Sequence, residues 1–136
     1  MSELTERWND PGVRESRKLY TEYRPEGIIA LHDKLFADPD RKWEREDLEE
    51  TLELHYKLGL WPNLIEVIGV LWSEGAVDTS FVYRMWGPGI LRAWNFWKEP
   101  VDHLREVGEF NAPVYRYFQR LAEALQTYAA SDEARQ

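Results

Sequence analysis

The chain of 136 residues contains no cysteine. Disulfide bonds, thiol nucleophiles and thiolate ligands for zinc or iron–sulfur clusters are therefore excluded. Basic residues are also in the minority, with 17 Lys and Arg against 25 Asp and Glu, and they form no dense stripe. A chain with a net charge of −8 repels the phosphates of nucleic acids, so we expect no nucleic-acid partner.

Long hydrophobic runs are missing as well. The apolar run from Val67 to Trp72 is far too short to cross a bilayer. The first ten residues, MSELTERWND, lack the basic start of a secretory signal peptide. We therefore expect a cytoplasmic protein that does not insert into a membrane.

The sequence signatures of common enzyme chemistries are also absent. There is no phosphate-binding glycine loop, no nucleophile elbow, no His-Glu-x-x-His and no calcium loop. The Glu-x-x-His pair of di-iron helical bundles is missing too. These absences favour a non-catalytic protein that needs no cofactor.

What the chain does contain is a nearly continuous series of helical signals. Helices are predicted over residues 11–24, 25–37, 43–58, 63–74 and 79–86, from Gly89 through Pro100, and over 111–130. Gly59, Gly75 and Gly87 are predicted to end helices, and Asp10, Asp78 and Asn111 to cap them. No strand-like alternation occurs. The prediction is an all-α, compact bundle of six or seven helices, a single domain over 1–136 with frayed tails at 1–9 and 131–136.

Tryptophan is abundant, and four of the seven tryptophans lie between Leu71 and Trp97. Trp94 and Trp97 share one helical face with other apolar residues, which predicts that they lie in the core. Phe96 is turned away from that face, beside Arg92 and His103. An aromatic ring flanked by arginine is typical of an interface, so these three residues are predicted to contact a partner. The alternative is that the first predicted helix folds over this side and buries Phe96.

The three histidines are the candidates for chemistry. His32 and His55 each lie on an apolar stripe of consecutive predicted helices, so the pair could hold a metal ion. The interpretation we favour is two buried imidazoles with hydrogen-bond partners. His103 follows Glu99 by one turn, which suits either a general-base pair or, as we favour, a surface ion pair.

The decapeptide EREDLEETLE carries six acids and one arginine. Such a run is typical of the solvated face of a helix. Mimicry of DNA phosphates is the alternative interpretation, and it requires a continuous sheet of acidic side chains.

Four short segments of the central region follow one another in a recognisable order: Glu-Gly at 74–75, Ala-Val-Asp at 76–78, Met-Trp-Gly at 85–87 and ILRAW at 90–94. Over about residues 48–125 the chain resembles a bacterial all-helical family of unknown function. Members of that family often carry membrane segments ahead of the domain. The resemblance implies a helical fold and leaves the activity open.

Three functions are compatible with this sequence. The favoured hypothesis is a non-catalytic interaction module that binds itself or a protein partner through an aromatic-bearing helix surface. The alternative is a small metal- or ligand-dependent enzyme built in the bundle. The third is an acidic inhibitor that imitates nucleic acid.

Overall fold

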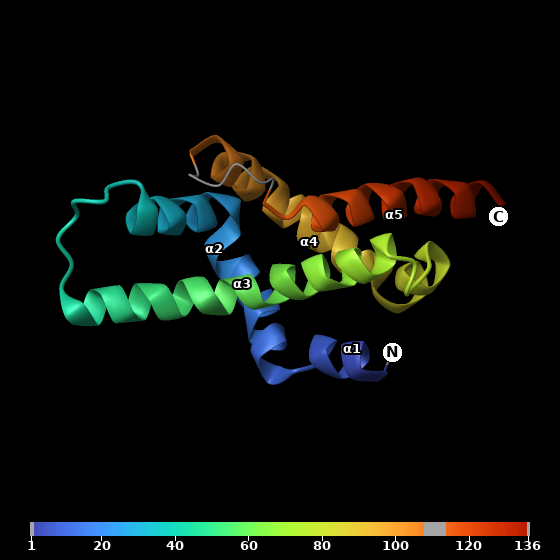
Figure 1. The fold of residues 1–136 in the computed structure, drawn as a ribbon, viewed down its shortest axis with the longest axis horizontal. Helices are drawn as coiled ribbons and strands as arrows, with labels where there is room; N and C mark the ends of the chain where they lie inside the picture. Colours follow the sequence, from blue (N-terminus) through green and yellow to red (C-terminus); the bar gives the residue numbers. More distant parts are fainter. Residues whose placement is uncertain (1, 108–113, 136) are drawn as a thin grey trace.

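A computed structural model describes residues 2–107 and 114–135. These residues form five α-helices and no strand: α1 (Ser2–Trp8), α2 (Pro11–Phe36), α3 (Arg45–Ser73), α4 (Thr79–Val107) and α5 (Arg116–Arg135) (Figure 1). The all-α fold is confirmed. The predicted number of six or seven helices is not confirmed, because several predicted ends fall inside continuous helices.

The helices pack into one compact unit. α3 runs back past α2 after the connection 37–44, and α5 packs on both α3 and α4 (Figure 1). α1 contacts α2 and α3. All five helices contribute to one core, in which Trp94 and Trp97 are each 5% exposed, in agreement with the helical pattern.

The boundary predicted before Pro25 is present as a kink. The backbone of Arg24 has φ 57° and ψ 171°, outside the helical range, and α2 continues on the far side. Proline disfavours a helical conformation in the residue before it, which accounts for the position of the bend. α2 is thus two helical segments in series.

The end predicted at Gly59 is wrong, because α3 continues through Gly59 and Pro62. Proline has no N–H, so Pro62 leaves the carbonyl of Leu58 without its helical donor. The hydroxyl of Ser16 donates to that carbonyl at 3.0 Å and also accepts from the N–H of Trp61 at 3.2 Å. A residue of α2 thereby supplies the hydrogen bonds that a proline-containing turn of α3 lacks.

The end predicted at Gly87 is also wrong. α4 continues through Gly87, Pro88 and Gly89 and then through Pro100. A Cβ on Gly87 would lie 2.8 Å from the ring of Tyr83, and one on Gly89 would lie 2.9 Å from the ring of Trp8. At both positions the absence of a side chain leaves room for an aromatic ring. The packing of these rings outweighs the weak helix preference of this segment.

The N-terminal residues are ordered into the fold, contrary to the prediction of a frayed tail over 1–9. Ser2–Trp8 forms α1, and Leu4 is only 6% exposed. The ring of Trp8 lies 6.1 Å from that of Trp61 and 6.0 Å from that of Trp86. At the other end, α5 extends to Arg135 instead of fraying after residue 130.

α5 begins against α3. The carboxylate of Glu66 accepts the N–H of Tyr117 at 2.8 Å and the N–H of Phe118 at 3.1 Å. These are amides of the first turn of α5, which have no partner within the helix. The predicted cap Asn111 lies outside the described residues, and Glu66 performs the capping from another helix.

The connection between α3 and α4 is built as its residues predict. Gly75 has φ +81°, a left-handed conformation that glycine adopts without steric cost. The carboxylate of Asp78 accepts the N–H of Phe81 at 2.7 Å. Asp78 therefore caps the first turn of α4.

The cap at Asp78 should contribute measurably to the stability of the fold. Asp78→Ala should lower the free energy of unfolding by about 1 kcal/mol, because one amide of α4 loses its acceptor. Urea denaturation followed by circular dichroism measures the change, and Asp78→Asn, which keeps an acceptor, should lose less. Equal stability of the alanine variant and the wild type would contradict the capping role.

Candidate functional site

A hollow with a volume of about 520 Å³ lies between α2, α3 and α4. It is lined by four cationic, three aromatic and one hydroxyl side chain: Arg14, Arg17, Lys18, Arg92, Tyr20, Trp61, Phe96 and Thr21. We call it the basic cleft. No acidic residue lines it, although the chain as a whole carries a net charge of −8.

One face of α2 supplies most of the positive charge. Arg17 and Lys18 follow Arg14 by three and four residues, and Thr21 follows at the next turn. Residues at this spacing lie above one another on a helix surface. The row from Arg14 to Thr21 spans about 10 Å along the helix axis, and Arg92 of α4 adds a fourth cation.

The floor of the basic cleft is aromatic. The ring of Tyr20 lies 4.9 Å from that of Trp61 and 5.7 Å from that of Phe96. Tyr20 is 1% exposed and Trp61 3%, while Phe96 is half-buried. The cleft therefore offers a well-packed apolar surface below its four cationic side chains.

The cations of the basic cleft are incompletely neutralised. Within the described part of the chain, Arg14, Lys18 and Arg92 take part in no ion pair. Arg17 donates to the carbonyl of Trp8 at 2.8 Å and stacks over two tryptophan rings. Partial burial, followed by the charge of Arg14, lowers the pKa of Arg17. A bound anion would relieve this repulsion between like charges.

Two of the three predicted interface residues meet here. Arg92 and Phe96 both line the basic cleft, whereas His103 is not among its lining residues. The ring of Phe96 packs on Tyr20 of α2, so the chain itself covers part of the surface that was predicted to face a partner. The α2 cations were not predicted as part of a site, although Arg17 and Lys18 follow Arg14 by three and four residues, which is a detectable signal.

His103 lies instead against α2. One oxygen of Asp33 is 2.7 Å from its Nε2, so the partner of His103 is Asp33 and not Glu99, whose side chain is exposed. The expected pairing with Glu99 is therefore wrong. His32 lies beside this pair, with its ring 6.4 Å from that of His103. The Nδ1 of His32 is buried, without a hydrogen-bond partner among the described residues.

His32 and His55 approach each other through an intervening ring. Phe36 lies 4.8 Å from His32 and 5.6 Å from His55. His55 is exposed, as is Leu52 at 44%, so this part of the predicted apolar stripe faces solvent. Burial, and then the charge of His55, lowers the pKa of His32. The expectation of two buried, hydrogen-bonded imidazoles is wrong for His55, and for the Nδ1 of His32.

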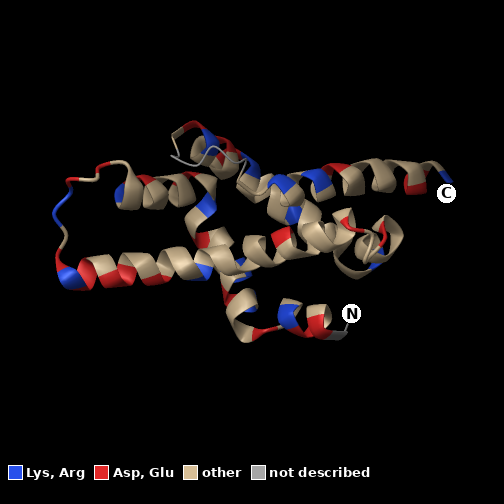
Figure 2. Cartoon of the chain, in the orientation of Figure 1, with Lys and Arg blue, Asp and Glu red and all other residues tan. Residues whose placement is uncertain are grey.

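The acidic decapeptide lies mainly in the first turns of α3, where Figure 2 shows red segments of the ribbon at one end of the molecule. Several of these acids are paired: Asp47 with Lys34 at 3.2 Å, Glu49 with Arg45 at 3.0 Å and Glu53 with Lys57 at 3.5 Å. The interspersed cations interrupt the sheet of negative charge that mimicry of nucleic acid requires.

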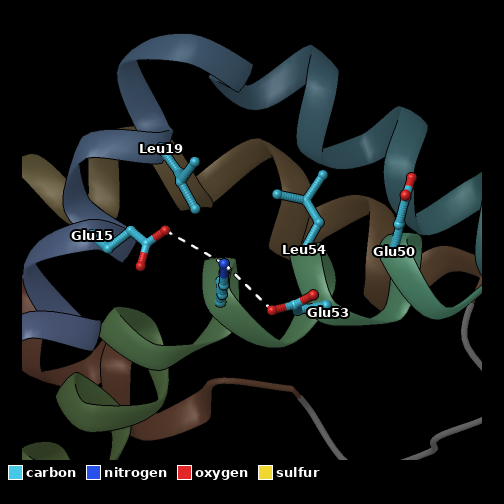
Figure 3. Close-up of a pocket in the computed structure, with 6 residues that line it drawn as sticks. Glu15, Leu19, Glu50, Glu53 and Leu54 are labelled. Carbon is cyan, nitrogen blue, oxygen red and sulfur yellow. Dashed lines mark ion pairs between the residues drawn. The ribbon is translucent and has the colours of Figure 1, made fainter.

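A second hollow, of about 150 Å³, lies beside this acidic segment (Figure 3). Its rim carries Glu15, Glu50 and Glu53, and the ammonium of Lys57 lies 3.5 Å from both Glu15 and Glu53. The lysine pairs with two of the three acids there. The basic cleft is larger and its charge is unpaired, so it is the better candidate for a binding site.

None of the helices within residues 2–107 and 114–135 is long and apolar enough to span a bilayer.

A family model described as a domain of unknown function (DUF4760) matches residues 2–125. The resemblance to a helical family of unknown function is thereby confirmed, over a longer segment than the sequence motifs indicated. No curated protein and no solved structure matches the chain.

Proposed function

We propose that this chain, which belongs to the DUF4760 family of unknown function, is an interaction module whose basic cleft binds an acidic segment of a partner protein. The observation that carries the proposal is the lining of the cleft. Four cations and no acid surround three aromatic rings in a chain of net charge −8. A positively charged cleft on an otherwise acidic chain attracts negatively charged ligands.

The arrangement of the cations favours a peptide over a small anion. Arg14, Arg17 and Lys18 form a row along α2, with Arg92 across from them on α4. A single phosphate is best held by donors that converge on one point, whereas a row of three cations about 6 Å long, with a fourth cation on another helix, matches carboxylates spread along a peptide. The aromatic floor suits an apolar side chain placed between those carboxylates.

The proposal is tested with a fluorescein-labelled peptide of four Glu-Glu-Leu repeats, titrated with the purified protein and followed by anisotropy. The double charge reversal Arg14→Glu/Arg92→Glu should weaken binding at least about tenfold, because it places two acids in the cleft. The matched control is Lys98→Glu/Arg120→Glu, which changes the net charge equally at exposed positions outside the cleft. The control should stay within about twofold of the wild type.

Three outcomes would overturn the proposal. Equal weakening in both double variants would show that only net charge matters. Absence of binding to the wild type at low salt would show that the cleft does not recognise acidic peptides. Loss of self-association in Arg14→Glu/Arg92→Glu alone, measured by sedimentation, would make a second copy of the chain the occupant instead.

A further inference from the structure

A second cluster of side chains lies away from the basic cleft, where the last part of α2 meets the last part of α4. His32 and Asp33 come from α2, and His103 comes from α4. Each offers one ligand atom, and the three atoms lie within 4.8 Å of one another. These residues do not line the basic cleft, so an inference about them is independent of the proposed function.

We propose that His32, Asp33 and His103 form a binding site for a divalent transition-metal ion of the zinc type. Two imidazole nitrogens and one carboxylate oxygen are ligands that Zn²⁺ binds in proteins. A tetrahedral zinc site with ligands at about 2.0–2.2 Å places pairs of ligand atoms about 3.4 Å apart. The Nε2 of His103 lies 2.7 Å from Asp33, and all three ligand atoms lie within 4.8 Å of one another, so small side-chain movements bring them to that spacing.

The surroundings of His32 favour this interpretation over a simple ion pair. A pair between Asp33 and His103 accounts for two of the three residues. It leaves the buried Nδ1 of His32 without a partner among the described residues, and an unsatisfied buried polar atom costs free energy. A metal ion would bind one atom of each of the three side chains, so that His32 would share a partner with Asp33 and His103.

The site has the openness that an exchangeable metal requires. The side chain of His103 is 25% exposed and that of Asp33 is 43% exposed, so an ion can enter from solvent. The ring of Phe36 lies 4.8 Å from that of His32. Three protein ligands leave a coordination position for water or a small ligand. The ion would also join α2 to α4, because its ligands come from both helices.

The test is a titration of the full, tag-free chain with ZnCl₂ by calorimetry, together with the visible spectrum of the Co²⁺ complex. We expect one ion per chain, a d–d spectrum of nitrogen and oxygen ligation, and a rise in melting temperature that EDTA reverses. His103→Ala and, separately, His32→Ala should weaken Zn²⁺ binding at least about 100-fold. Circular dichroism confirms that each variant is folded.

His55→Ala is the matched control, because His55 is a nearby exposed histidine outside the cluster. It should leave Zn²⁺ affinity within about twofold of the wild type. No binding to the wild type at millimolar ZnCl₂ would overturn the proposal. So would binding that both folded variants, His103→Ala and His32→Ala, retain, because the ion would then lie on other surface groups.

Discussion

Trp94→Ala should lower the free energy of unfolding by about 3–5 kcal/mol. The Trp94 side chain is 5% exposed, and its ring lies 5.1 Å from that of Phe118 in an edge-on contact at 68°. The residue thus joins α4 to α5 at the centre of the core. Replacing the tryptophan with alanine removes a large buried apolar group from the core. It also leaves a cavity that the surrounding helices cannot close. Because domains of this size are stable by about 5–15 kcal/mol, the loss is a large share of the total.

Urea denaturation of Trp94→Ala and of a matched control, Trp43→Ala, measures this effect. Trp43 lies half-buried in the connection between α2 and α3, where its ring carries the guanidinium of Arg41 at 4.3 Å. The ammonium of Lys34 lies 5.4 Å from the same ring. Because each partly exposed cation–π contact contributes about 0.5–1 kcal/mol, the control should lose no more than about 2 kcal/mol. Similar losses in the two variants would contradict the central role of Trp94.

The helical periods of this chain could be predicted from the sequence, but the helix ends could not. Trp94 and Trp97 recur at helical spacing, which is a local signal, and both are buried. Pro62 and Pro88 are also local signals, and they indicate breaks that do not occur. The turn at Pro62 persists because Ser16, more than 40 residues away, supplies hydrogen bonds to it. No pattern within α3 encodes that contact.

The candidate sites show the same division between local and distant signals. Arg92 and Phe96 stand one turn apart, so the sequence brings them together on one helix. The α2 cations join them only because α2 packs on α4. The pairing of His103 with Glu99 was predicted from nearness in sequence, whereas its actual partner, Asp33, is 70 residues away.

Glu66→Ala should lower the free energy of unfolding by about 2–3 kcal/mol. Glu66 is one of few polar residues in an apolar part of α3, and its carboxylate accepts two amides of the first turn of α5. Its negative charge also interacts favourably with the positive end of the α5 dipole. The approach is close: a Cβ on Gly69, one turn along α3, would lie 2.6 Å from the carbonyl oxygen of Tyr117. The amides of α5 are therefore directed at α3 and have little room for an alternative acceptor.

Glu66→Gln separates the hydrogen bonds from the charge. Glutamine keeps one side-chain oxygen as an acceptor but carries no charge, so we expect a loss between those of the wild type and the alanine variant. Glu49→Ala is the control, because Glu49 forms an exposed pair with Arg45, and such a pair contributes about 0.3–0.5 kcal/mol. Urea denaturation gives the stabilities, and hydrogen exchange of the Tyr117 and Phe118 amides gives the local effect. If exchange of those two amides is as slow in Glu66→Ala as in the wild type, Glu66 does not hold the start of α5.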